Sequence, residues 1–203
     1  KTGLLTFFLD ILKGALPPFI AYFIFRNSVF EYSTFVISDF AVFLTGLMVV
    51  IGHIYPVFLK FKGGKGIASS IGVFLVCSSV FGWQWAIVNV MALVAATVFI
   101  YLTEFGAMGS FIAITPSAIG CSIRMMYIYS NTLNSITITF NVITNMFILA
   151  ICCFTWFAHR NNIGRMLAGD EHPTSIKEMV VKMKAKKIKA KAEQDKQSES
   201  TNN

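Results

Sequence analysis

Several stretches of this chain run for about 20 residues with almost no charged side chain, the length that an α-helix needs to cross the hydrocarbon core of a bilayer. Of the 203 residues, 55% are hydrophobic and only 13% are charged. Soluble domains carry roughly 25% charged residues. The sequence therefore predicts a membrane protein and argues against a cytosolic globular domain.

The apolar runs do not alternate with polar residues as the strands of a membrane barrel would, so we expect helices. The predicted fold class is all-α: a polytopic membrane helical bundle with six spans in this chain. The six predicted spans are residues 4–25, 34–54, 67–81, 85–102, 105–123 and 136–158. Residues 1–172 would form the transmembrane domain and residues 173–203 a basic cytoplasmic tail.

The positions of the basic residues predict which way the bundle is inserted. Arg26 and Arg124 stand alone on one side, and the side richer in Lys and Arg is expected to be cytoplasmic. Residues 177–203 carry eight Lys against four acidic residues, which suits a solvated tail near anionic lipid headgroups. No aromatic or groove-reading pattern accompanies these lysines, so nucleic acid is not an expected partner. The predicted cytoplasmic side holds Lys60, Lys62, Lys65, Arg160, Arg165 and the tail.

The stretch 52–72, GHIYPVFLKFKGGKGIASSIG, joins a helix end to a glycine-rich loop with three lysines. Glycines allow tight turns with exposed backbone N–H groups, and the next helix would point its positive dipole end at the loop. A Walker A motif is excluded because Lys65 is followed by Gly66 instead of Ser or Thr. The loop predicts a phosphate site, although a basic loop that only fixes topology is the alternative. The candidate groups are Lys60, Lys62, Gly63, Gly64, Lys65 and Gly66.

A second polar cluster, HRNNIGRMLAGDE at 159–171, directly follows the last predicted span. His159, Asn162 and Arg165 are one helical turn apart and could share a face toward the bundle. Amide, guanidinium and the Glu171 carboxylate could together orient a phosphorylated polyol. Interfacial anchoring of the helix is the alternative.

Three ionisable residues are predicted at or near membrane depth, where they are costly and commonly functional. Asp10 and Lys13 are three residues apart, so a simple intrahelical ion pair is the alternative to a polar cavity. His53 could act as a general base on an alcohol or hydrogen-bond an acyl phosphate. The four cysteines have no metal-site or redox spacing, and we expect neither a metal ion nor a cofactor.

Taken together, GHIYPVFLKFKGGKGIAS, HRNNIGRMLAGDE and LTFFLDILKG resemble the bacterial family of acyl-phosphate:glycerol-3-phosphate acyltransferases of the PlsY type, up to about residue 171. The resemblance implies a multi-pass plasma-membrane enzyme with its motif loops in the cytoplasm. It also implies seven spans and a further Ser/Gly/Asn/Arg-rich motif between the first two. We expect that missing span and motif upstream of Lys1. Tyr55 stands where the family usually has Phe, and Glu104 where a basic residue is usual.

The reaction implied by the resemblance transfers an acyl group from acyl phosphate to glycerol 3-phosphate, which gives lysophosphatidate and phosphate. We assign His53, Lys65, Asn162 and Glu171 to catalysis; either His53 or the acyl-phosphate oxygens would take the hydroxyl proton. The rival hypothesis is a membrane transporter of organic phosphates, which would also need basic cytoplasmic loops. The expected substrate-binding residues are Lys13, Lys60, Lys62, Gly63, Gly64, Gly66, His159 and Arg165.

Overall fold

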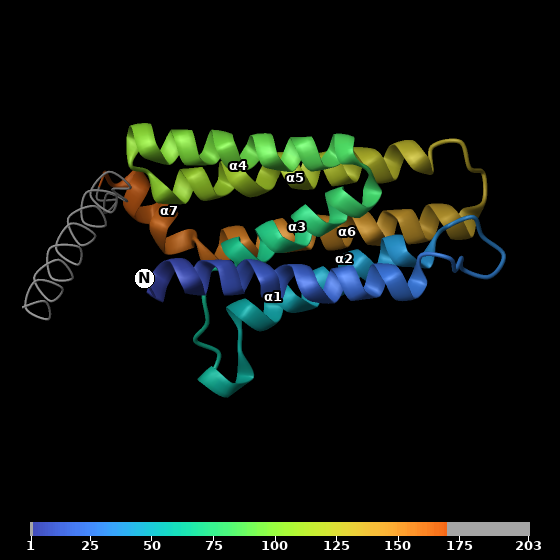
Figure 1. Ribbon diagram of the computed structural model, residues 1–203, viewed down its shortest axis with the longest axis horizontal. Coiled ribbons are helices and arrows are strands. Elements are labelled where there is room, and N and C mark those ends of the chain that lie inside the picture. Colours follow the sequence, from blue (N-terminus) through green and yellow to red (C-terminus); the bar gives the residue numbers. More distant parts are fainter. Residues whose placement is uncertain (1, 170–203) are drawn as a thin grey trace, which may run out of the picture.

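The computed structural model describes residues 2–169, and every regular element of that part is helical (Figure 1). Its long helices run side by side along the longest axis of the molecule. The helices are α1 (Thr2–Phe25), α2 (Ile37–Ile54), η1 (Val57–Leu59), α3 (Ile67–Phe81), α4 (Trp83–Thr103), α5 (Gly106–Ile128), α6 (Ser135–Ala158) and α7 (Arg160–Leu167). The predicted all-α membrane bundle is thus confirmed, and each of the six predicted spans contains a helix.

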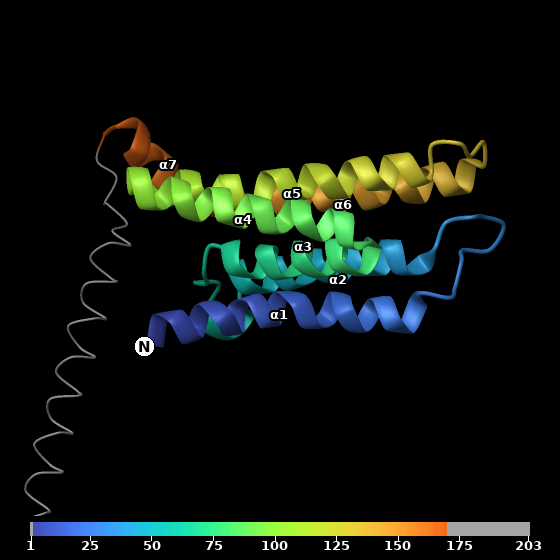
Figure 2. The same ribbon diagram turned by 45° about the horizontal axis from the view of Figure 1, so that its top comes forward.

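The helices lie in layers around α3 (Figure 2). Helix α1 forms one edge and packs on α2 and α3, whereas α4, α5 and α6 form the other side. Helix α3 contacts all five other long helices, and its buried residues include Val73, Phe74 and Cys77. The N-terminal end of α1 and helix α7 lie at the same end of the bundle, called here the α7 end (Figure 1).

Five of the helices are long and apolar enough to cross a membrane, but α3 has only 15 residues. A helix of that length spans about 22 Å, which is short of a hydrocarbon core of about 30 Å. Protein surrounds α3, so it need not match the lipid thickness. The predicted count of six full spans is therefore not reproduced, and the shortness of α3 leaves space at the α7 end of the bundle.

Helices α1 and α3 approach closely because glycines face the opposite backbone. A Cβ on Gly14 of α1 would run into the backbone of Ser69, and a Cβ on Gly72 of α3 into that of Ile11. Small residues at such contacts let membrane helices pack backbone to backbone. Polar pairs add to the packing on the other side, where Ser70 of α3 and Thr155 of α6 share a hydrogen bond of 3.0 Å.

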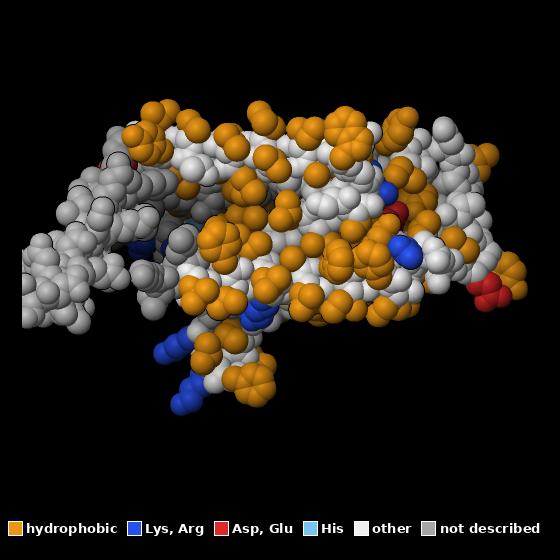
Figure 3. All heavy atoms as spheres, in the orientation of Figure 1, with side chains coloured by type: hydrophobic (Ala, Val, Ile, Leu, Met, Phe, Trp, Pro, Cys, Tyr) orange, Lys and Arg blue, Asp and Glu red, His pale blue; other side chains and the backbone are white. Residues whose placement is uncertain are grey.

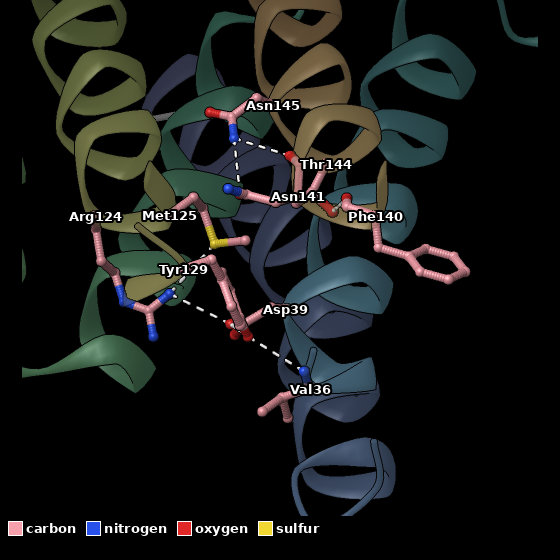
Figure 4. Close-up of polar contacts among 9 residues, drawn as sticks. All are labelled: Val36, Asp39, Arg124, Met125, Tyr129, Phe140, Asn141, Thr144 and Asn145. Atoms are coloured by element: carbon pink, nitrogen blue, oxygen red, sulfur yellow. Dashed lines mark hydrogen bonds and ion pairs between the residues drawn. The ribbon is translucent and has the colours of Figure 1, made fainter. Parts of the chain in front are cut away.

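Helix α5 ends at Ile128, five residues beyond its predicted end at residue 123. It therefore includes Arg124, which the prediction left outside the span. Arg124 is buried, with Nη1 3.7 Å from Oδ2 of Asp39 on α2 and its guanidinium 3.5 Å from the centre of the Phe81 ring. Asp39 is therefore paired with a cation from another helix. Tyr129 donates a hydrogen bond of 2.8 Å to the same carboxylate and accepts one of 3.2 Å from the Val36 N–H (Figure 4).

This cluster joins α2 to α5 at the end of the bundle opposite α7, and Figure 4 shows its side chains converging between the helices. Because a buried charge needs a partner, the pair stabilises the association of the two helices only while both groups are present. Burial and the neighbouring Asp39 carboxylate raise the pKa of the Tyr129 hydroxyl, which therefore stays protonated and able to donate.

Residues 56–62, between α2 and the glycine-rich loop, leave the side of the bundle; we call them the finger. Figure 1 shows this segment projecting away from the long axis beside α1. Hydrogen bonds of 3.0 to 3.1 Å within the finger fold it into a compact turn, among them Phe61 N–H to Pro56 O and Lys62 N–H to Leu59 O. The predicted tail, 173–203, lies outside the described residues.

Candidate active site

A cavity of about 610 Å³ opens at the α7 end of the bundle, where α3 begins. Six helices (α1 to α5 and α7) and the glycine-rich loop line it, so residues far apart in the sequence meet there. The lining residues are Phe7, Asp10, His53, Gly64, Lys65, Gly66, Ile67, Ala68, Ile100, Gly106, Ala107, Ser110, His159, Asn162 and Arg165.

The first wall of the cavity pairs a carboxylate with an imidazole. Asp10 of α1 lies with Oδ1 3.6 Å from Nδ1 of His53, in the last turn of α2. Asp10 and Lys13 therefore do not form the intrahelical pair that their spacing allowed; Asp10 turns toward another helix. An acid on one ring nitrogen fixes the orientation of a histidine and leaves the other nitrogen for chemistry.

The glycines of the loop are required by close contacts with His53. The Gly64 N–H donates a hydrogen bond of 3.2 Å to the His53 carbonyl oxygen, and the imidazole covers Gly64 so closely that a Cβ there would strike Nε2. A Cβ on Gly63 would meet the carbonyl oxygens of His53 and Ile54. Gly66 has φ +80°, a left-handed conformation that glycine adopts without strain. Of the three glycines, only Gly66 adopts a left-handed conformation, and Gly63 and Gly64 are required by close packing on His53 and Ile54.

The N-terminus of α3 lies at the cavity, and the first N–H groups of a helix have no partner within the helix. Gly66 is the N-cap residue and provides no side-chain cap, and Gly66, Ile67 and Ala68 are among the residues that line the cavity. Lys65 stands directly before this helix start and also lines the cavity. Free N–H groups, the helix dipole and an ammonium group together favour an anion such as a phosphate.

The opposite wall comes from the junction of α6 and α7. His159 caps both helices, since its backbone N–H bonds to Trp156 O at 2.9 Å and its carbonyl accepts from Asn162 N at 2.9 Å. Its side chain is only 3% exposed, yet neither ring nitrogen has a hydrogen-bond partner among the described residues. Buried polar atoms without partners are rare and call for a ligand or an ordered water.

The charge state of His159 follows from its surroundings. Burial, reinforced by the nearby Lys65 ammonium, lowers the pKa of the imidazole to about 4. The ring is therefore neutral near pH 7, with one donor and one acceptor nitrogen. Asn162 and Arg165 complete this wall, and Arg165 Nη2 donates a hydrogen bond of 2.8 Å to Asn162 Oδ1. The three residues share one face of the junction, as their spacing predicted.

The structure does not bring every predicted site residue to the cavity. Lys13 is exposed on α1, and Gly63 packs against the backbone of His53 and Ile54; neither residue lines the cavity. Lys60 and Lys62 lie exposed on the finger and are not among the lining residues. Glu171 lies outside the described residues. Conversely, Ser110 and the apolar side chains Phe7 and Ile100 line the cavity with no motif in the sequence to mark them.

These features define an integral membrane protein of bundled helices, with a cavity at one end whose polar groups suit a phosphate. The family model described as "Glycerol-3-phosphate acyltransferase" matches residues 1–169. The chain therefore belongs to the glycerol-3-phosphate acyltransferase family.

Individual relatives bear the same description. The glycerol-3-phosphate acyltransferase of Lawsonia intracellularis is 32% identical over 171 residues, which cover 84% of this chain and 70% of the relative. That of Aquifex aeolicus is 31% identical over 186 residues, covering 85% and 73%. That of Enterococcus faecalis is 32% identical over 193 residues, covering 94% and 75%.

Solved structures of PlsY (YgiH), an integral membrane glycerol 3-phosphate acyltransferase, have a similar fold. Its glycerol 3-phosphate form aligns with a TM-score of 0.60 and 28% identity over 89% of this chain and 74% of that one. Its lysophosphatidic acid form aligns with a TM-score of 0.57 and 27% identity, covering 85% and 72%. The predicted family membership is thus confirmed.

Proposed function

We propose that this protein is an enzyme that acylates glycerol 3-phosphate, with acyl phosphate as the donor. The products would be lysophosphatidate and inorganic phosphate, as in the first acylation of phospholipid synthesis. The observation that carries this proposal is the convergence of the α3 N-terminus, Lys65 and Arg165 on one cavity with the buried, unpartnered ring of His159.

The charges of the cavity suit two phosphorylated substrates. The α3 N-terminus with Lys65 provides one set of anion-binding groups, and the α7 face with Asn162 and Arg165 provides a second. An arginine that is already held by an amide presents its remaining N–H donors in a fixed direction, which favours a phosphate or a polyol. We assign one phosphate to each of these two groups.

The apolar part of the lining suits the acyl donor. Phe7 of α1 and Ile100 of α4 line the same cavity as the polar groups, and both helices also face outward with many exposed apolar side chains. An acyl chain could thus lie among lipid and apolar side chains while its phosphate reaches Lys65. The amphiphilic character of acyl phosphate fits this arrangement better than a fully water-soluble donor.

The chemical step joins the two substrates directly. The glycerol hydroxyl oxygen attacks the acyl carbonyl carbon, the bond from that carbon to the phosphate oxygen breaks, and inorganic phosphate leaves. Phosphate is a good leaving group, so the demand on the enzyme is positioning and removal of the hydroxyl proton. We assign proton removal to His53, whose Nδ1 faces Asp10; transfer to an acyl-phosphate oxygen is the alternative that mutation of His53 tests.

We further propose a bacterial plasma membrane location with the α7 end facing the cytoplasm, where glycerol 3-phosphate is made. This orientation follows the excess of Lys and Arg at that end. It also places the cavity where the soluble substrate arrives and the lipid product can remain in the membrane. Lysophosphatidate would then stay in the cytoplasmic leaflet and would not need to cross the bilayer.

Labelled glycerol 3-phosphate tests the function. In detergent micelles with acyl phosphate, the label should appear in an organic-soluble lipid, and replacing acyl phosphate with acyl-CoA should abolish it. An Arg26→Gln variant, changed at the opposite end of α1, is the matched control and should retain activity. Uptake of unmodified label into vesicles, with no lipid formed, would instead identify an organic-phosphate transporter.

A further inference from the structure

The apolar side chains of the finger, residues 56–62, are exposed and do not pack on the described part of the chain, residues 2–169. Phe58 is 100% exposed, and Val57, Leu59 and Phe61 are 62–69% exposed. Isolated exposed apolar residues are ordinary, but four on one short projection form a patch that marks an interaction surface. The finger lies near the boundary of the bundle, because the apolar span that contains α2 continues to residue 59.

The backbone of the finger is built to hold these side chains outward. Lys60 and Phe61 both have positive φ, 52° and 60°, a left-handed conformation that non-glycine residues rarely adopt. The turn is nevertheless closed by its own hydrogen bonds, such as Lys60 N–H to Val57 O at 3.1 Å. A turn that keeps two residues in a left-handed conformation and presents apolar side chains outward indicates a contact surface.

The basic residues of the finger lie beside this apolar patch. Figure 3 shows blue basic side chains along the edge of the projection toward the α7 end, with orange apolar side chains beyond them. Lys60 and Lys62 are the basic residues of the finger, and both are exposed. This division matches the bilayer interface, where apolar groups enter the acyl region and cationic groups reach the headgroups.

We propose that the finger is an interfacial anchor that inserts Phe58 and its apolar neighbours into the bilayer while Lys60 and Lys62 bind anionic phospholipid headgroups. The finger projects sideways from the bundle beside α1 (Figure 1), which would place it in the lipid next to that helix. Anchoring there would hold the following loop, with Gly64 and Lys65, at the depth of the headgroups. The inference concerns lipid contact and stands independently of the acyl donor.

The position of the finger is measurable with a bimane fluorophore on Phe58→Cys in nanodiscs. The background is Cys153→Ala, because Cys153 is the exposed cysteine and the other three are buried. Tyr32→Cys, on the loop at the opposite end, provides an aqueous reference, and Met146→Cys, on the outer face of α6, a lipid reference. Quenching by iodide reports water, and quenching by doxyl lipids reports the bilayer.

We expect the label at position 58 to be quenched by doxyl lipids as at position 146 and to be shielded from iodide relative to position 32. Iodide quenching equal to that at position 32 would overturn the anchor. A label shielded from both quenchers, with emission that changes when glycerol 3-phosphate is added, would overturn it too, because the finger would then be a lid packed on the cavity.

The headgroup preference is tested with phosphatidylglycerol and phosphatidylcholine that carry the same doxyl group. A basic residue near an anionic surface contributes about a fivefold preference. Two lysines together therefore give an upper limit of roughly 25-fold. Quenching of the position-58 label should favour phosphatidylglycerol, and the preference should disappear in Lys60→Gln/Lys62→Gln. The Arg26→Gln control should keep it; equal quenching by both lipids with the lysines present would refute the headgroup contact.

Discussion

The carboxylate of Asp10, near the start of α1, lies 3.6 Å from Nδ1 of His53, at the end of α2. The two residues are 43 positions apart, yet the packing of α1 on α2 makes them neighbours in the wall of one cavity. The pairing gives the imidazole an orientation and leaves Nε2 next to the glycine-rich loop. It therefore links a motif of the first helix to the proposed proton acceptor.

Removing the orienting carboxylate should slow the chemical step. Asp10→Asn keeps the size of the side chain but loses its charge, so kcat should fall by about tenfold or more while KM for glycerol 3-phosphate changes little. His53→Ala should cost about 100-fold or more. Steady-state kinetics over a range of pH would check both variants. Near-normal kcat in His53→Ala would assign proton transfer to the acyl phosphate itself.

The close contact of α1 and α3 should be sensitive to a single added methyl group. Gly72→Ala places a Cβ against the backbone of Ile11, and Gly14→Ala places one against the backbone of Ser69. Overpacking of this kind lowers the free energy of unfolding by about 1–3 kcal/mol. Thermal unfolding in mild detergent measures the effect. Gly52→Ala, on α2 with open space around it, is the matched control and should unfold like the parent chain.

Acid should destabilise the bundle through His159. The pKa of the folded-state imidazole is lowered from 6.5 to about 4, so between these values the unfolded chain binds a proton that the folded chain refuses. Stability should therefore be unaffected above about pH 6.5 and fall by up to about 1.4 kcal/mol per pH unit below it. His159→Gln should flatten this part of the profile. A profile identical to that of the parent chain would show that His159 is not the titrating group.

The ion pair at the end opposite α7 should behave as one unit. Asp39→Asn or Arg124→Gln alone leaves a buried group without its partner, which costs about 3–5 kcal/mol. The double variant should recover part of that loss, because no unpaired charge remains. Unfolding free energies of the four proteins form a double-mutant cycle. Additive losses in the cycle would mean that the two side chains contribute independently.

The helices could be predicted from the sequence because lipid exposure demands long apolar runs, and each of the six runs formed a helix. The extent of α5 was underestimated because Arg124 resembles a loop cation until its partner Asp39 is seen. The 15 residues of α3 mark it as short, but only the packing shows that other helices shield it. Local composition carries no signal for such long-range pairing.

The candidate site was predictable only in part for the same reason. The glycines and Lys65 form a continuous motif, and His159 with Asn162 and Arg165 forms another, so both were found from the sequence. Lys60 and Lys62 belong to the same run of residues as Lys65, yet the left-handed turn directs them away from the cavity. The lining contributed by α4 and α5 depends on how these helices pack, which motif spacing does not encode.

Binding of glycerol 3-phosphate to the Lys65→Gln variant tests the central claim most directly, since that claim is a phosphate site at the start of α3. Equilibrium binding of the labelled compound would be measured in detergent for the parent chain, Lys65→Gln and the Arg26→Gln control, with thermal unfolding to confirm that all three are folded. Losing a charge-assisted contact worth about 1.5–3 kcal/mol should weaken binding by about tenfold or more. Arg26→Gln should bind as the parent does. Equal affinity of Lys65→Gln and the parent chain would contradict the account.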